Sequence, residues 1–305
     1  SLAATTGSTT ANITPAALTV RANDDAKFVT LSDANGYAGV TYTGFVNGET
    51  ALALGGTLAI SRSNSGTNTA GSYSGVLVPS GLSSNNYSIS YVRGDYTIVP
   101  ANQLVVKVSN ASTVYGTAAN YSVTSAQYLG ANNQVVTLSS VAVDANNQVT
   151  IQDGASASAS FTLAPQSAQW STAQKLRVGS YQLGTSGTVT ENSQNFSNTI
   201  TVVGSHTVTA KGLNATVSGT SKTYDGSAVM TGMTLGLSTV EALDAVTVSG
   251  SGAYVSKDVG TRNYTVSNVA LSGADAGNYY LATGNSLTGS GTIAAKQLTL
   301  SASKT

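Results

Sequence analysis

Apolar and polar residues alternate in short runs along this chain of 305 residues. Residues 18–22, 40–43 and 87–91 each place an apolar side chain at every second position. A period of two is typical of β-strands that bury one face. A single helical turn is expected at two places, residues 49–54 and 238–244; Ser238 and Glu241 in the second have the spacing of a capping box.

A short connector occurs four times, at residues 12–20, 97–106, 207–215 and 292–300. Each copy ends one β-rich run, passes a small hinge and begins the next run with a leucine. These leucines are Leu18, Leu104, Leu213 and Leu298. A repeat of about one domain length indicates a tandem array.

The connectors divide the chain into three complete modules and parts of two others. The predicted boundaries are 1–17 for the tail of a preceding module and its hinge, then 18–101, 102–211 and 212–296 for the three modules, and 297–305 for the start of a following module. The second module is longer than its neighbours. Its surplus is predicted to form a hairpin from residues 148–151 and 160–163.

A second set of landmarks recurs once in each module. A glycine lies shortly before a tyrosine, and an asparagine followed by an aromatic residue comes at a near-constant distance. The tyrosines and the asparagine-aromatic pairs are Tyr73 with Asn86 and Tyr87, Tyr181 with Asn195 and Phe196, and Tyr264 with Asn278 and Tyr279. We interpret them as braces between two strands and one core, with the asparagine holding the turn. An aromatic sugar pocket is the functional alternative.

These patterns predict an all-β fold, an elongated tandem array of three β-rich modules. Each module is expected to be either an immunoglobulin-like sandwich or a β-grasp-like sheet with one short helix. The strand count favours the sandwich, and the two predicted helical turns favour the β-grasp.

Composition excludes several classes of function. Only 9% of the residues are charged and the net charge is zero, whereas nucleic-acid binding needs clustered Lys and Arg. No run of about 20 apolar residues is present, so membrane insertion is not expected. The chain has no cysteine and therefore no disulfide framework or thiolate chemistry. The hydrophobic fraction of 41% and the regular alternation argue against disorder.

The third module resembles a YDG repeat of large bacterial adhesins. The matching motifs are KTYDG at 222–226, GAY at 252–254, KDVG at 257–260 and GADAGNY at 273–279. The first module resembles the related MBG repeats through ANDDAK at 22–27, DAN at 33–35, YTGFVNGET at 42–50, GSY at 71–73 and NNY at 85–87. It departs from that family at Phe28 and Val29, where Tyr-Gly is usual. The second module keeps Tyr115 and Gly116 and the ending, but diverges between them.

The resemblance implies a bacterial cell-surface or extracellular setting. Such repeats are found in the stalks of filamentous-haemagglutinin-like proteins exported by two-partner secretion, including biofilm-matrix adhesins that hold exopolysaccharide. The expected partners are a polysaccharide or cell-surface ligand and other modules of the same long chain.

Candidate catalytic residues are few, and we expect this protein to have no enzymatic activity and no cofactor. His206 is the only histidine, so no histidine pair is available for a metal, and no Gly-x-Ser-x-Gly motif marks a nucleophile. Two acidic groups are candidate calcium sites. One is Asp24 and Asp25 near Asp33, and the other is Asp258 near Asp275. Neither group matches an EF-hand loop, so solvated carboxylates are the alternative. A Lys–Asn cross-link would use Lys107 or Lys222.

Three functions follow as hypotheses. The leading one is a structural and adhesive stalk segment. The second is a filament subunit that associates homotypically by donating residues 1–17 to a neighbour's sheet. The third is a carbohydrate-binding module centred on Trp170, the only tryptophan, whose alternative role is to fill a core.

Overall fold

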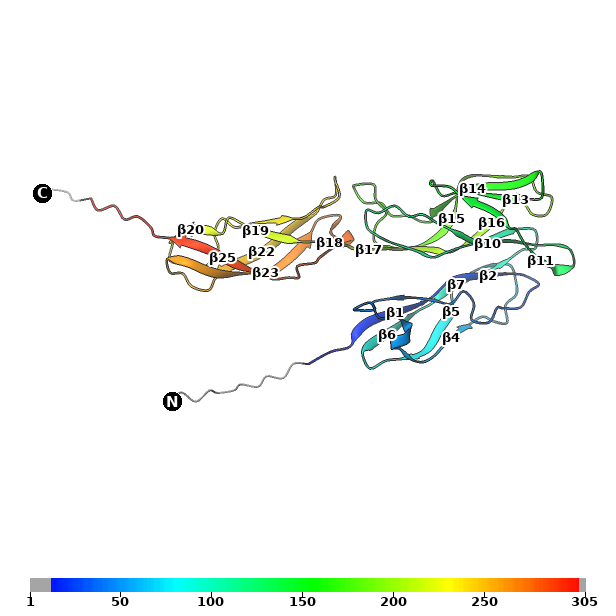
Figure 1. Ribbon diagram of the computed structural model, residues 1–305, viewed down its shortest axis with the longest axis horizontal. Coiled ribbons are helices and arrows are strands. Elements are labelled where there is room, and N and C mark those ends of the chain that lie inside the picture. Colours follow the sequence, from blue (N-terminus) through cyan, green and yellow to red (C-terminus); the bar gives the residue numbers. More distant parts are fainter. Residues whose placement is uncertain (1–11, 302–305) are drawn as a thin grey trace. The chain divides into compact units, whose positions relative to one another are not determined.

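The computed structural model describes residues 12–301, which form β-strands joined by turns (Figure 1). The helical segments are three 3-10 turns, η1 (Ala51–Ala53), η2 (Ala131–Asn133) and η3 (Ala276–Asn278), and residues 12–301 contain no α-helix. The predicted all-β class is therefore confirmed. Within the same residues, no helix has the length and apolar character needed to cross a bilayer.

The chain divides into two compact units. The first contains the chain up to Asn110 together with Asn120–Gln166 and Gln182–Ser205. The second contains Ala111–Ala119, Ser167–Tyr181 and the chain from His206 onward. Segments of the predicted second module occur in both units, and the three-module division stays a prediction.

The first module consists of two sheets within the first unit (Figure 1). One sheet has the order β3-β1-β6, with β1 (Ala16–Ala22), β3 (Val40–Thr43) and β6 (Tyr87–Val92). The other has the order β2-β7-β5-β4, with β2 (Asp25–Phe28), β4 (Gly55–Arg62), β5 (Gly71–Ser83) and β7 (Gly94–Val99).

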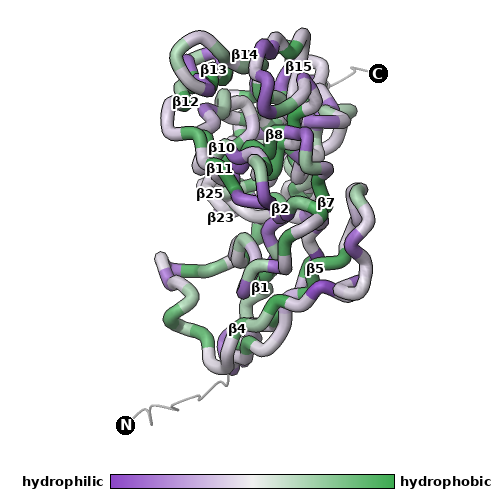
Figure 2. Tube along the Cα trace, turned by 90° about the vertical axis from the view of Figure 1, so that its right-hand side faces the viewer, coloured by the Kyte–Doolittle hydropathy of each residue, from purple (hydrophilic) through white to green (hydrophobic). Residues whose placement is uncertain are grey.

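Side chains from both sheets meet in one core. Leu18 and Val20 of β1 and Tyr87 of β6 are buried against Leu58 of β4 and Leu82 of β5. Short hydrophobic and hydrophilic stretches follow each other along the tube in Figure 2, as the alternating pattern requires. A two-sheet sandwich without an α-helix decides between the two predicted folds, because a β-grasp needs a helix on its sheet.

The rest of the first unit carries two further sets of strands. One sheet has the order β11-β10-β8-β16, from β8 (Leu104–Val108), β10 (Val123–Leu129), β11 (Val135–Thr137) and β16 (Ile200–Val203). The other strands pair in succession as β12 (Ser140–Val143), β13 (Gln148–Asp153), β14 (Ala157–Pro165) and β15 (Gly179–Glu191). The antiparallel pair β13 and β14 is the hairpin predicted for the surplus of the second module.

The second unit repeats the two-sheet arrangement. Its largest sheet has the order β20-β25-β23-β22, from β20 (Ser221–Thr223), β22 (Thr247–Tyr254), β23 (Gly260–Ser272) and β25 (Leu287–Ala294). Facing strands are β18 (Lys211–Leu213) with β24 (Tyr279–Leu281), and β19 (Ala215–Ser218) with β21 (Thr234–Leu237). The unit also holds β9 (Ala111–Val114) paired with β17 (Ser205–Thr209).

The same two parallel pairings occur three times along the chain. The strand that carries the connector leucine lies parallel to a later strand in β1–β6, β8–β16 and β18–β24. A short strand that follows it lies parallel to the last strand of the repeat in β2–β7, β9–β17 and β20–β25. Three copies of one uncommon pairing pattern indicate one shared topology.

The landmark glycines have equivalent positions in this topology. Gly71, Gly179 and Gly260 are the first residues of β5, β15 and β23, each of which is 13 residues long. The constant spacing of the landmarks in the sequence is therefore the constant length of one long strand and its following turn.

One of the two predicted helical turns is wrong. Residues 49–54 contain η1, but residues 238–244 contain no helix. The backbone N–H of Asn214 donates to Ser238 Oγ, and the Glu241 carboxylate pairs with Lys211. Neither side chain of the supposed capping box is left to cap a helix.

The connectors also differ from one another. Leu18, Leu104 and Leu213 are buried in strands, whereas Leu298 lies outside any strand and is 89% exposed. Pro15 and Pro100 flank β1 and β7 without entering them. Most of the predicted tail at 1–17 lies outside the described residues, as do the last residues of 297–305.

Candidate functional site

The first candidate site is the contact between the first and second modules inside the first unit, here called the first joint. Its apolar part combines Phe28 and Val99 with Val105, Leu129 and Val203. Phe28 replaces the tyrosine usual in MBG repeats, and this aromatic side chain packs into the joint. The departure from the family pattern therefore keeps a large apolar anchor.

Polar side chains flank the apolar part of the first joint. Lys107 Nζ forms an ion pair with Asp25 Oδ1 at 2.5 Å. Gln182 Nε2 donates to Asp24 Oδ2 at 2.6 Å, and the Asp95 N–H donates to Asp24 Oδ1 at 2.6 Å. Burial raises the pKa of Asp24, although the hydrogen bond from Asp95 and the charge of Arg21 oppose the rise.

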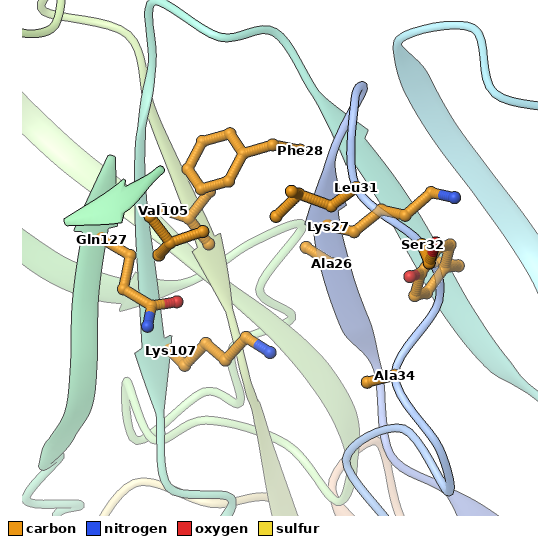
Figure 3. Close-up of a pocket in the computed structure, with 11 residues that line it drawn as sticks. Ala26, Lys27, Phe28, Leu31, Ser32, Ala34, Val105, Lys107 and Gln127 are labelled. Carbon is orange, nitrogen blue, oxygen red and sulfur yellow. The ribbon is translucent and has the colours of Figure 1, made fainter. Parts of the chain in front are cut away.

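A small pocket of about 130 Å³ opens at this joint. Figure 3 shows Phe28, Leu31 and Val105 on its wall and the Lys107 ammonium inside it. The Lys27 ammonium points the other way, toward Ser32. Because Lys107 is already paired with Asp25, we assign this pocket to imperfect packing of the joint.

The second candidate site, the second joint, lies inside the second unit. The Tyr115 hydroxyl lies 2.5 Å from Ser171 Oγ and donates to Asp244 Oδ2 at 2.6 Å. The Tyr279 hydroxyl donates to the same carboxylate oxygen at 2.6 Å. The two tyrosine rings meet edge to face with centroids 5.2 Å apart. One carboxylate thus ties the second module to the third.

Protonation states at the second joint follow from these contacts. Burial opposes ionisation of Asp244, but hydrogen bonds from Tyr115 and Tyr279 outweigh it and lower the pKa of this carboxyl. Burial and the hydrogen bond to Asp244 raise the pKa of Tyr115 to about 12. The tyrosines therefore stay neutral donors and Asp244 stays an ionised acceptor at neutral pH.

Gly116 follows Tyr115 and is required by the backbone. Its φ is +89°, and a Cβ at this position would lie 2.5 Å from a Glu241 carboxylate oxygen. The Tyr-Gly pair therefore combines an anchor for the joint with the turn that delivers it.

Residues 167–181 complete the second joint. Arg177 forms an ion pair with Asp275 at 2.7 Å, and the Asp275 side chain is fully buried. The Val178 N–H donates to Asn278 Oδ1 at 3.1 Å. Asn278 Nδ2 is the one buried side-chain nitrogen or oxygen atom in the described part of the chain without a hydrogen-bond partner. Residues 167–181 belong to the predicted second module, and through these bonds they attach it to the third module.

The aromatic landmarks occupy core positions. Tyr87, Phe196 and Tyr279 are buried, as are Tyr181 and Tyr264, and Tyr73 is half-buried. Tyr73 packs against the cluster of Leu77 and Tyr96, whereas Tyr87 belongs to the cluster of Leu18. In the first module the prediction of a single core for the pair is therefore wrong, because the long strand carries Tyr73 away from the asparagine-aromatic end. Asn86 and Asn195 are exposed, and Asn278 is buried.

Trp170 is 53% exposed, so the alternative prediction that it fills a core is wrong. Its backbone forms an isolated antiparallel bridge with Leu176, and its carbonyl accepts a hydrogen bond from Arg177 Nε at 3.0 Å. Its role as a ligand contact stays a prediction.

The remaining candidates for chemistry have structural partners. His206 is buried in β17 with Nε2 2.8 Å from Thr113 Oγ1, and burial lowers its pKa. Asp258 accepts a hydrogen bond from Ser256. Across residues 12–301, no three His, Cys, Asp or Glu side chains are grouped so as to hold a metal ion.

The lysines proposed for a cross-link lie beside carboxylates. Lys107 pairs with Asp25, and Lys222 pairs with Asp225 at 2.8 Å. A lysine beside an asparagine occurs elsewhere: Lys27 Nζ donates to Asn68 Oδ1 at 2.7 Å. Sequence reasoning did not single out this pair, because 41 residues separate its members.

The cations around Asp33 were also missed: the sequence grouped Asp33 with Asp24 and Asp25, whereas the structure places it among positive charges. Lys27 and Arg62 form ion pairs with this carboxylate at 2.7 Å and 2.8 Å, and Tyr37 donates to it. Burial opposes its ionisation, but the hydrogen bonds from Arg62, Lys27 and Tyr37 hold its pKa at about 2. A charged residue placed in an alternating strand, such as Lys27 in β2, is the one signal that could have indicated this charged cluster.

The fold and the joints define a tandem array of β-sandwich modules. Residues 209–286 match the family model of the YDG domain, and residues 18–97 match that of the MBG domain (YGX type). The chain therefore carries one domain of each family, as the resemblance predicted. No curated protein and no solved structure matches the chain.

Proposed function

We propose that this chain is a structural and adhesive stalk segment of a bacterial cell-surface or biofilm-matrix adhesin. Its modules space and present binding regions in the extracellular medium. The YDG and MBG domains are structural modules, and the proposed role is not enzymatic.

The observation that carries the proposal is the pair of joints. The first buries Phe28 and the second buries Tyr115, each beside an ion pair or an ionised carboxylate. Modules joined by flexible linkers would need no such contacts, whereas a spacer that transmits force or holds a distance benefits from them.

Small-angle scattering in solution tests the stalk. We expect a rod whose maximum dimension is well over ~100 Å, judged from three modules that each have a radius of gyration of ~13 Å. The profile should be the same with calcium and with a chelator, since Asp25, Asp33 and Asp275 are paired with cations. A compact particle contradicts the proposal, and a calcium-dependent lengthening restores the acidic groups as metal sites.

A second candidate function, sugar binding at Trp170, is favoured by the exposure of this side chain. An exposed indole can stack on a sugar face. Retention on immobilised polysaccharide should fall for Trp170→Ala and not for Val229→Ala, a matched loss of an exposed apolar side chain in the same unit. Equal retention by both variants rejects this function.

A further inference from the structure

The cluster around Asp33 contains more positive than negative charge. Lys27 and Arg62 share the single carboxylate of Asp33. The next carboxylate, Asp25, is paired with its own cation, Lys107. Within this cluster two cations therefore share one carboxylate, although both cationic side chains are less than 10% exposed.

The surplus charge is located on Lys27. Arg62 Nε and both of its terminal nitrogens donate to Asp33, to Asn64 and to the carbonyls of Ser65 and Thr67. Lys27 Nζ donates to Asp33 Oδ1 and Asn68 Oδ1. Its third N–H has no hydrogen-bond acceptor among residues 12–301. The guanidinium is satisfied, whereas the ammonium can take one more acceptor.

Lys27 lies at a polar depression of about 490 Å³ that is open to solvent. The hydroxyl residues Thr30, Ser32 and Ser65 line it together with Asn68, and all four are exposed. The Asp33 carboxylate also lines it, and Arg62 and Lys27 together outweigh its negative charge. Figure 3 shows the Lys27 ammonium directed to the side of Ser32, away from the apolar pocket of the first joint. Hydroxyls and an amide around a cation match a ligand that carries both an acid and hydroxyl groups.

We propose that this depression, defined by Lys27, Thr30, Ser32, Ser65 and Asn68, binds the carboxylate of an acidic sugar residue. The third N–H of the Lys27 ammonium donates a hydrogen bond to this carboxylate, and the sugar hydroxyls form hydrogen bonds with the polar side chains of the rim. The ligand class rests on the proposed extracellular role, while the anion site rests on the geometry of the depression.

Titration calorimetry of the whole chain at low salt tests the site with three probes. These are an oligomer of galacturonate, the matched neutral oligomer of galactose, and inorganic phosphate. Lys27→Gln removes the charge, and Asn68→Asp supplies an internal carboxylate at an exposed position where folding is not at risk. Lys257→Gln makes the same change of charge at an exposed site of the second unit.

We expect the galacturonate oligomer to bind and the galactose oligomer not to bind. Lys27→Gln and Asn68→Asp should each weaken binding about tenfold or more, the loss of one charge-assisted hydrogen bond, and Lys257→Gln should not. If phosphate binds and the galacturonate oligomer does not, the proposal of an acidic sugar as the ligand is wrong. If Asn68→Asp binds the galacturonate oligomer as tightly as the wild type, the depression is not the binding site. Both failures leave the stalk untouched, because scattering tests it independently.

Discussion

At the scale of single residues, Asp33 shows how the fold creates chemistry that the sequence does not display. Three side chains spread over residues 27–62, Lys27, Tyr37 and Arg62, meet around one carboxylate in the first module. Each is an ordinary surface residue in the sequence. Their meeting depends on which loops lie beside β2 and β4, and local pattern does not contain that information.

The lowered pKa of Asp33 predicts an acid-sensitive first module. The folded pKa of about 2 lies below the ordinary aspartate value of 3.8, so this carboxylate contributes stability above pH 4 that is lost as the pH falls toward 2. The contribution is about 2 kcal/mol. Hydrogen exchange of the β5 and β7 amides between pH 5 and pH 2 measures it.

Asp33→Asn provides the matching variant. It leaves two cations of the cluster without a carboxylate and should lower stability at pH 7 by about 3 kcal/mol. The same variant should also lose the acid-dependent part of the exchange. If the wild-type and variant profiles run parallel from pH 5 to pH 2, Asp33 is not the titrating group.

Tyr115 carries a second residue-scale prediction. Tyr115→Phe keeps the ring in the second joint but removes the hydroxyl that donates to Asp244. The second unit should lose about 1–3 kcal/mol, since a buried charged acceptor loses a donor. Trp170, the only tryptophan, adjoins Ser171 in this unit and reports urea unfolding by fluorescence.

The control for Tyr115 is Tyr280→Phe, a loss of the same hydroxyl from a residue that is 55% exposed. It should leave the fluorescence transition in place. A shift of equal size in both variants means that Asp244 does not depend on the Tyr115 hydroxyl.

At the scale of elements, alternation and repetition predicted the strands well. The hairpin of β13 and β14 was located from two alternating runs, because such a hairpin is held together by local pairing. The helix at residues 238–244 failed for the opposite reason. Its capping-box residues bind Asn214 and Lys211, which lie 24 and 30 residues earlier in the sequence. Parallel pairings such as β1–β6 were equally invisible, since no short-range signal marks them.

The connector leucines give an element-scale test with its own control. Leu18 in β1 is 1% exposed, and Leu298 at the same place of the repeat is 89% exposed. Leu18→Ala should cost about 2–5 kcal/mol, the usual range for a buried leucine, and Leu298→Ala should cost almost nothing. Thermal unfolding of the wild type and of the two variants measures both losses of stability. Equal losses would mean that Leu298 is buried in solution.

At the scale of the whole molecule, the two joints are the features that distinguish this chain from a string of separate domains. The recurring position at the end of β2 and just after β9 supplies an anchor each time, Phe28 in one joint and Tyr115 in the other. The sequence indicated the repeat of this position through the family motif. The partners of the anchors, such as Leu129 for Phe28 and Asp244 for Tyr115, could not be predicted, because each comes from a loop or strand end of a neighbouring module.

The first joint contains one group, the Asp24 carboxylate, whose ionised form destabilises the joint at neutral pH. Burial raises the pKa of Asp24, so the ionised carboxylate is less favourable in the folded chain than in the unfolded chain. The stabilising contribution of this group is complete below the unfolded pKa and is lost as the pH rises through the folded pKa. Asp24→Asn removes the charge and keeps the shape. Its Oδ1 can still accept from Asp95, and a flipped Gln182 amide can accept from its new amide.

We therefore expect Asp24→Asn to stabilise the first unit at pH 7 and to lose this advantage as the pH is lowered, because the wild-type carboxyl then becomes neutral too. Hydrogen exchange of β7 and β15 at several pH values measures both effects in the intact chain. Asp258→Asn, an exposed position in the second unit, should change neither. A destabilised Asp24→Asn variant at every pH would show that the hydrogen bonds to the carboxylate outweigh its desolvation. The joint would then be held by the charge of Asp24 rather than in spite of it.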